Sequence, residues 1–259
     1  MNIFLNILVP FICLIIGYLM GSANISILLG KMIFKQDPRD YGSHNCGATN
    51  CGRLWGKKYF FIVLLFDAFK TVASLFLCWA ILTFVKFNGQ YLMPTATQMY
   101  NADISGFIIQ WPVYWMASIG ALLGNVFPLF TNFRGGKAVS TYVGIAFVTS
   151  WGFTITGAVA FFITLFKSRY VSLSSIITGI VYVISSWTWA ILLQCHVLPN
   201  NLFWIICYGP LFYCNYVYAI MVTILVSVMI VRHHANIGRL VNGNERKIGW
   251  LKSKEKVEN

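Results

Sequence analysis

Long apolar segments alternate along this chain with short polar segments that are rich in glycine and basic residues. The apolar segments at residues 3–29, 59–85, 112–130 and 173–193, and one that ends near residue 231, have roughly the 20 residues that a transmembrane helix needs. The pattern therefore predicts a chain that crosses a membrane several times.

The apolar stretch at residues 138–166 allows two interpretations. One long helix would put Lys167 and Arg169 on the outer side, against the rule that basic residues flank the cytoplasmic ends of transmembrane helices. Two short helices that turn near residues 150–152 keep both charges cytoplasmic, and short helices are acceptable where they pack inside a bundle or line a wet cavity. We expect the second arrangement, and thus an all-α integral membrane protein with a bundle of about seven transmembrane helices, two of them short.

Composition agrees with this class and gives the chain an orientation. It is 58% hydrophobic and 10% charged, against roughly 25% charged residues in soluble domains. Membrane orientation explains the net charge of +12 better than nucleic acid does, since the basic residues flank apolar segments. Of 19 lysines and arginines only Lys86 falls on the expected outer side, so the N-terminus should lie outside and the C-terminus in the cytoplasm. We expect residues 1–231 to form the membrane domain, with cytoplasmic glycine-rich loops, and 232–259 to form a basic cytoplasmic tail.

The segment at residues 42–53, GSHNCGATNCGR, has the composition of an anion-binding loop. Its glycines permit positive φ and close approach to a ligand, and successive backbone N–H groups of such a loop can form an anion-binding concavity. Neutral hydrogen-bonding side chains and one guanidinium suited to phosphate complete it. The candidate anion-binding residues are Ser43, Asn45, Gly47, Thr49, Asn50 and Arg53. Taken alone, the loop is equally compatible with a solvated connection between two helices.

A second loop of the same character follows the third apolar segment. Arg134-Gly135-Gly136-Lys137 opens a helix, so backbone N–H groups, the positive end of the helix dipole and two cations converge, as in a phosphate site. It is not a Walker A loop, because the GxxxxGK[ST] spacing is absent. Taken alone, these cations could also be ordinary flanking charges of a membrane helix.

Further candidates lie where later helices reach the cytoplasmic side. Ser172 could cap the helix that follows it, and His233 and Asn236 share one helix face after the last apolar segment. Within the second apolar segment, Asp67 and Lys70 are one turn apart at a depth where ionisable groups are usually paired. We expect an ion pair that supports the structure or the site, with a proton pathway as the alternative.

Several catalytic signatures are absent from the sequence. It contains no His-x4-Asp pair, GxSxG elbow, HExxH or aspartate cluster for Mg²⁺, and its seven cysteines form no CxxC pair. We expect neither a metal nor a cofactor. An enzyme built from these loops would bind phosphates through cations and amides, and would act by positioning and charge stabilisation.

Together these segments resemble the bacterial membrane glycerol-3-phosphate acyltransferases that use acyl phosphate as donor (PlsY). The resemblance covers nearly the whole chain. Its motifs are Gly21-Ser22 and Arg39, GSxNxGATNxxR at 42–53, GxxFPxFxxFRGGK at 124–137, RYxSLxSI at 169–176 and RHxxNIxRLxxGxExKIG at 232–249. It implies seven transmembrane helices in the bacterial cell membrane, an extracytoplasmic N-terminus and cytoplasmic motif loops.

The resemblance also implies an activity, the transfer of a fatty acyl group from acyl phosphate to the 1-position of glycerol 3-phosphate, giving lysophosphatidic acid and phosphate. The family is thought to use no protein general base, because a substrate phosphate accepts the hydroxyl proton. The expected partners are these two substrates and the lipid bilayer, with the protein as a monomer. By motif position, the expected catalytic residues are Ser43, Arg53 and Lys137, and the expected substrate-binding residues are Asn45, Gly47, Thr49, Asn50, Arg134, Gly135, Gly136, Ser172, His233 and Asn236.

The chain departs from the family pattern at a few positions. Asn125 and Arg134 replace a usual histidine and lysine, Ala138 and Ser140 a usual glycine and alanine, and His44 stands where glycine is common. The alternative function is a membrane transporter of a small phosphorylated solute. A transporter should show polar groups crossing to the outer side, whereas here they concentrate on one side.

Overall fold

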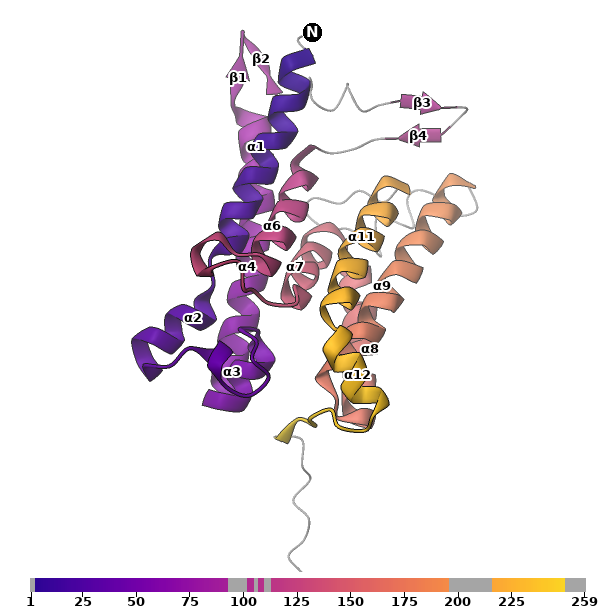
Figure 1. The fold of residues 1–259 in the computed structure, drawn as a ribbon. Coiled ribbons are helices and arrows are strands. Elements are labelled where there is room, and N and C mark those ends of the chain that lie inside the picture. Colours follow the sequence, from indigo (N-terminus) through magenta and orange to yellow (C-terminus); the bar gives the residue numbers. More distant parts are fainter. Residues whose placement is uncertain (1–2, 93–101, 105–106, 110–112, 196–215, 250–259) are drawn as a thin grey trace, which may run out of the picture.

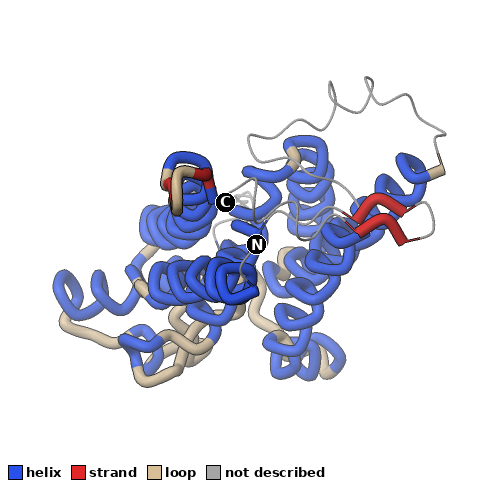
Figure 2. Tube along the Cα trace, turned by 90° about the horizontal axis from the view of Figure 1, so that it is seen from above, coloured by secondary structure: helices blue, strands red, loops and turns tan. Residues whose placement is uncertain are grey.

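The computed structural model describes residues 3–92, 102–104, 107–109, 113–195 and 216–249. Viewed from above, the main helices are seen close to end-on, so their axes run roughly parallel (Figure 2). They are α1 (Ile3–Ser22), α4 (Lys57–Phe84), α6 (Met116–Val126), α7 (Val139–Thr149), α8 (Trp151–Ser168), α9 (Val171–Gln194) and α11 (Tyr216–Arg232). Among the described residues, five helices are long and apolar enough to cross a membrane, or six if α11 and the short α12 (His234–Val241) form one bent span. The predicted helical membrane bundle is confirmed.

The stretch predicted to hold two short helices does turn, but its two helices are unequal. α7 ends at Thr149 and α8 begins at Trp151, while Ser150 between them is extended. The Ser150 hydroxyl oxygen accepts a hydrogen bond from the Phe153 amide at 3.3 Å and so caps α8. With 18 residues α8 is long enough to cross a membrane, and with 11 residues α7 is not.

The first apolar segment is not the single helix that the hydropathy pattern predicts. α1 stops at Ser22, and α2 (Ile25–Leu29) and a π-helical turn, η1 (Gly30–Phe34), follow after a break. The carbonyl oxygen of Ala23 in this break accepts a hydrogen bond from Lys70 Nζ at 2.8 Å. Lys70 also pairs with Asp67 at 2.8 Å, so the expected intramembrane ion pair is present and supports the break. A partner 47 residues away supplies the missing hydrogen bond, which local hydropathy cannot reveal.

α1 and α6 pack backbone against backbone through glycines. A Cβ atom added at Gly17 would collide with the Ala117 carbonyl group. One added at Gly124 would collide with the carbonyl oxygen of Tyr18. Glycine and other small residues at a helix interface let membrane helices approach closely, which matters because lipid offers no hydrophobic driving force for their association. This pair fixes the start of the second glycine-rich loop against the end of α1.

The connection between α4 and α6 contains two short antiparallel hairpins, β1 (Lys86–Phe87) with β2 (Gln90–Tyr91) and β3 (Ala102–Ile104) with β4 (Phe107–Ile109). The first turns at Asn88-Gly89, where both residues have the positive φ of a two-residue hairpin turn. Both hairpins lie at the end of the bundle opposite α3 (Ala48–Trp55) and α12 (Figure 1). The glycine-rich and basic loops therefore gather at one end of the bundle. Residues 250–259 of the predicted tail lie outside the described residues.

Candidate functional site

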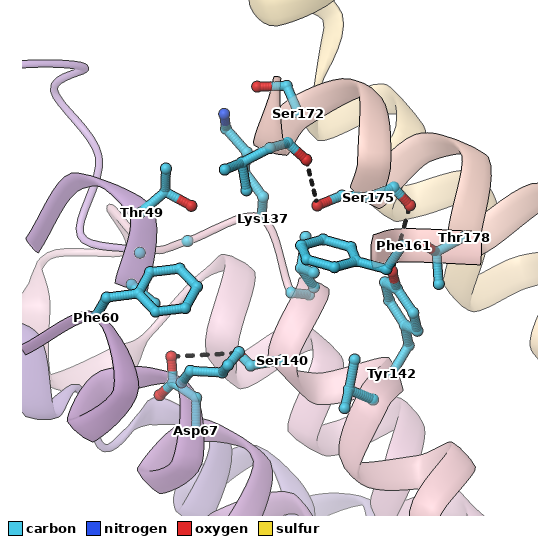
Figure 3. A pocket seen from close by; sticks show the side chains of 18 of the residues that line it. Thr49, Phe60, Asp67, Lys137, Ser140, Tyr142, Phe161, Ser172, Ser175 and Thr178 are labelled. Carbon is cyan, nitrogen blue, oxygen red and sulfur yellow. Dashed lines mark hydrogen bonds between the residues drawn. The ribbon is translucent and has the colours of Figure 1, made fainter. Parts of the chain in front are cut away.

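A cavity of about 470 Å³ opens between these loops and continues between α4, α7, α8 and α9. All the predicted site residues line it except Arg134 and Gly135. We call its polar opening the cationic mouth, formed by Ser43, Arg53, Lys137, Ser172, His233 and Asn236, and its far part the apolar end, formed by Tyr142, Ala146, Phe153, Gly157 and Tyr182. In Figure 3, Thr49, Lys137 and Ser172 lie in the upper half of the view and Tyr142 lies in the lower half.

Asn50 holds the first loop in shape from its centre. The residue is 1% exposed, and the two hydrogens of its Nδ2 are shared among three carbonyl oxygens of residues 38–45 at 2.7–3.1 Å. Its Oδ1 accepts a hydrogen bond from the Ser43 amide at 2.9 Å. Gly42 has φ +65°, and a Cβ atom there would collide with this Oδ1. The amide of Asn50 is therefore directed at the loop itself and fixes the position of Ser43.

The first loop leads into the N-terminus of α3. Oδ1 of Asn45 accepts a hydrogen bond from the Gly47 amide at 3.2 Å, and Gly47 occupies the N-cap position without a side-chain hydrogen bond. First-turn amides of a helix have no intrahelical acceptor, and in α3 the residues that carry them, Ala48 and Thr49, line the cavity. The positive end of the α3 dipole thus adjoins the cationic mouth.

Arg53, in the last turn of α3, joins the first loop to the C-terminal segment. One of its terminal nitrogens donates to the carbonyl oxygen of Arg246 at 3.1 Å, while its buried Nε has no hydrogen-bond partner among the described residues. Burial lowers the pKa of the guanidinium and nearby Glu245 opposes that shift, but an arginine remains charged at neutral pH. A buried donor beside a cavity is suited to an anionic ligand.

The second loop is held by close backbone packing. The Gly136 amide donates to the Asn125 carbonyl oxygen at 2.9 Å, and a Cβ atom at Gly135 would collide with the same oxygen. Gly135 therefore serves packing, and Arg134 is exposed away from the cavity. In this segment only Gly136 and Lys137 of the predicted residues face the cavity.

Lys137 begins a chain of hydrogen bonds that ends in the C-terminal segment. Its Nζ donates to Oδ1 of Asn236, and Nδ2 of Asn236 donates to the Ser172 hydroxyl oxygen at 2.7 Å. Glu245 Oε1 accepts from Asn236 at 2.8 Å and from Ser172 at 2.5 Å. Its Oε2 accepts from Arg239 at 2.7 Å. Glu245 thereby orients the Asn236 amide so that its oxygen faces Lys137.

Burial changes the titration of the groups in the cationic mouth. It lowers the pKa of Lys137 to about 8; Glu245 opposes this shift and nearby guanidinium groups add to it. His233 follows α11, is 2% exposed, and has Nδ1 2.8 Å from the Met229 carbonyl oxygen, so Nδ1 carries the proton and Nε2 is the acceptor. Burial, followed by the charge of Lys137, lowers the pKa of His233 to about 4. At neutral pH the mouth therefore holds Lys137 and Arg53 as cations and His233 as a neutral ring.

The far part of the cavity is lined by the helices themselves. Ala146, Phe153 and Tyr182 line this apolar end and are 5%, 2% and 2% exposed. On the α4 side the cavity lining includes a polar contact, in which the Ser140 hydroxyl donates to Asp67 Oδ2 at 3.4 Å (Figure 3). The site thus joins a cationic opening to an apolar slot.

Two residues that the sequence predictions left out of the site organise it. Glu245 stands in the last motif, and the available signal in the sequence was a lone carboxylate within a basic segment; the structure shows that it is buried. Arg39 stands in the first motif group and donates to the Thr131 carbonyl oxygen at 2.8 Å, which ties the first loop to the second. Only the fold reveals these contacts, because each joins segments far apart in the sequence.

Comparison with known proteins identifies the family. Residues 11–243 match the family model described as Glycerol-3-phosphate acyltransferase. The chain belongs to the glycerol-3-phosphate acyltransferase family. Relatives of that name include one from Staphylococcus haemolyticus, 34% identical over 93% of this chain and 98% of the relative. Another, from Mycoplasmopsis synoviae, is 30% identical over 97% of this chain and the whole relative.

Solved structures of the acyltransferase PlsY have the same fold. The crystal structure of PlsY, an integral membrane glycerol 3-phosphate acyltransferase, in its glycerol 3-phosphate form matches with a TM-score of 0.69 and 25% identity, over 93% of this chain and 96% of that chain. His44 and Ala138, two of the expected departures from the family pattern, have φ of +55° and +59°, a conformation that glycine adopts readily. The predicted resemblance to the PlsY acyltransferases is confirmed.

Proposed function

We propose that this protein transfers a fatty acyl group from an acyl phosphate to the 1-hydroxyl of glycerol 3-phosphate, giving lysophosphatidic acid and inorganic phosphate. The observation that carries the proposal is a single cavity with a cationic mouth and an apolar end. Phosphate groups suit the first and an alkyl chain suits the second. The names of the relatives support glycerol 3-phosphate as acceptor.

The reaction needs positioning and charge stabilisation more than a protein base. The glycerol hydroxyl oxygen attacks the acyl carbon, the bond from that carbon to the phosphate oxygen breaks, and the hydroxyl proton passes to a phosphate oxygen. Lys137 and Arg53 neutralise phosphate charge, while Ser43 and the amides of the first loop orient the acyl phosphate. His233 has a pKa of about 4, which makes it a weak base at neutral pH. Its Nε2 and the Asn236 Oδ1 instead accept hydrogen bonds from the hydroxyl groups of glycerol 3-phosphate.

The same proposal includes an orientation in the bacterial cell membrane. The mouth faces the cytoplasm, with the N-terminus outside and the C-terminus inside, because basic residues concentrate at that end. We propose that the protein acts as a monomer, because residues of a single chain line the cavity. Residues 1–231 form the membrane domain and 232–259 the tail, but Asn236 and Glu245 of the tail belong to the hydrogen-bond network of Lys137.

A donor comparison tests the proposed function. Purified protein in detergent receives glycerol 3-phosphate with palmitoyl phosphate, palmitoyl-CoA or palmitoyl-carrier protein, and both phosphate and lysophosphatidic acid are followed. We expect product from palmitoyl phosphate alone. Product from a thioester only would keep the acyltransferase and refute the donor. A folded protein that gives no product with any donor would refute the reaction and favour solute transport, to be measured as uptake into vesicles.

A further inference from the structure

The apolar end of the cavity is closed by the corner between α7 and α8. α7 stops at Thr149 and α8 starts at Trp151, and the buried residues Ala146 near the end of α7 and Phe153 in the first turn of α8 both line the cavity. From the mouth residue Ser172 to Tyr182 the rise along α9 is roughly 15 Å. The slot therefore has a finite length, set by where α7 ends.

Aromatic packing and hydroxyl pairing make this closed end rigid. The Phe153 ring stacks on Tyr218 at a centroid distance of 6.0 Å and meets the edge of Tyr182 at 5.7 Å. The Tyr218 hydroxyl pairs with Thr149 at 2.8 Å and with the Tyr182 hydroxyl. A shift of these rings would separate buried hydroxyl groups from their partners, which is costly in an apolar interior. Phe162, by contrast, lines the cavity on α8 and is exposed to the surroundings of the bundle.

We propose that Phe153, backed by Tyr182 and Tyr218, sets the upper limit on the length of the acyl chain that this protein accepts. The inference rests on the proposed acyl transfer. A chain whose terminal methyl group reaches the Phe153 ring fills the slot. A longer chain would have to displace the ring or leave through the side of the bundle, and a shorter chain leaves space unfilled.

Three substitutions test this limit. Phe153→Leu lengthens the slot, whereas Ala146→Leu shortens it, because Ala146 lines the same closed end. Phe147→Leu is the matched control: Phe147 is the next residue of α7 but is 52% exposed and does not line the cavity. Each protein receives glycerol 3-phosphate with equal amounts of myristoyl, palmitoyl and stearoyl phosphate, and mass spectrometry gives the ratios of the three products. Ratios within one reaction do not depend on the fraction of active protein.

Burying one methylene group changes the binding constant roughly fourfold. Successive donors in the series of myristoyl, palmitoyl and stearoyl phosphate differ by two methylene groups. We therefore expect Phe153→Leu to raise the stearoyl-to-palmitoyl product ratio about tenfold and Ala146→Leu to raise the myristoyl-to-palmitoyl ratio about tenfold. Phe147→Leu should leave both ratios unchanged within about twofold. Parental ratios in both Phe153→Leu and Ala146→Leu would overturn the inference.

Failure of the parent protein with every acyl phosphate would refute the proposed donor and not the length limit. In that case the length limit is tested by measuring the dissociation constants of myristoyl, palmitoyl and stearoyl lysophosphatidic acid for the same variants, since binding requires no reaction. The order of dissociation constants must shift toward the longer chain in Phe153→Leu and toward the shorter chain in Ala146→Leu. The same order in all variants would overturn the limit.

Discussion

The two ends of the cavity are held in shape by different interactions. In the cationic mouth, hydrogen bonds join side chains from segments far apart in the sequence, such as Lys137 to Asn236 and Ser172 to Glu245. At the apolar end, the buried rings of Phe153, Tyr182 and Tyr218 pack against each other. A substitution in the mouth removes a charge or a hydrogen bond, whereas one at the apolar end changes volume. The mouth should therefore govern the rate, and the apolar end the choice of chain.

The largest effects are expected from removing the cations of the mouth. Lys137→Ala and Arg53→Ala should each lower kcat/KM by roughly 10²–10³, because each removes a charge that stabilises phosphate in the transition state. Steady-state kinetics with glycerol 3-phosphate and palmitoyl phosphate measure this, and the chain-length ratios should remain parental. Arg134→Ala is the matched comparison and should cost less than about tenfold, since its exposed side chain does not line the cavity. Near-normal activity of folded Lys137→Ala and Arg53→Ala would contradict the assignment.

A smaller effect is expected from releasing the first loop. Asn50→Ala removes the hydrogen bonds between the Asn50 side chain and residues 38–45, and a typical hydrogen bond is worth about 1 kcal/mol net. We expect kcat/KM to fall by roughly 10- to 100-fold and the amide of Ser43 to exchange its hydrogen faster. Hydrogen exchange with mass spectrometry, beside the kinetics, checks both. Slow exchange at Ser43 in an Asn50→Ala protein of low activity would argue instead for a direct substrate contact of Asn50.

The pH dependence tests the charge of Lys137. Because burial lowers its pKa to about 8, the cation is present below that pH and is lost above it. The value of kcat/KM should therefore fall about tenfold per pH unit above pH 8. Lys137→Arg should lack this alkaline decline up to about pH 10, since a guanidinium stays protonated. An identical decline in Lys137→Arg would assign it to another group.

The smallest effect concerns a strained residue beside the mouth. Ala138 has φ +59°, a conformation that costs an L-residue about 1 kcal/mol and glycine little. Ala138→Gly should therefore stabilise the protein by up to about 1 kcal/mol in thermal unfolding in detergent. Ala158→Gly within α8 is the control and should destabilise it by about the same amount. Destabilisation by both would show that the buried Ala138 methyl group matters more than its backbone strain.

Much of the fold could be predicted because membrane helices follow local rules. Hydropathy located the long helices, and the charges of Lys167 and Arg169 identified the turn between α7 and α8. The break after α1 could not be predicted, since Lys70 on another helix makes it possible. The hairpin at Asn88-Gly89 was not predicted, although an Asn-Gly pair is a local signal for a two-residue hairpin turn.

The sequence predicted which residues gather at the candidate site, but not which of them face the ligand and which pack against the protein itself. Motif spacing identified Lys137 and Asn236, and the fold brings them into contact. Gly135 was predicted to contact substrate, yet it contacts the backbone of α6. A glycine-rich loop can bind a ligand or pack closely against its own protein, and both need the same residue type. Only the position of the neighbouring helix separates the two.

The most direct test of the account is a structure of this protein with palmitoyl lysophosphatidic acid bound. We predict the phosphate between Lys137 and Arg53, and the terminal methyl group against Phe153 at the closed end of the cavity. A phosphate in the mouth with the alkyl chain leaving the bundle between α4 and α8 would contradict the length limit. A phosphate bound away from both cations would contradict the proposed site itself.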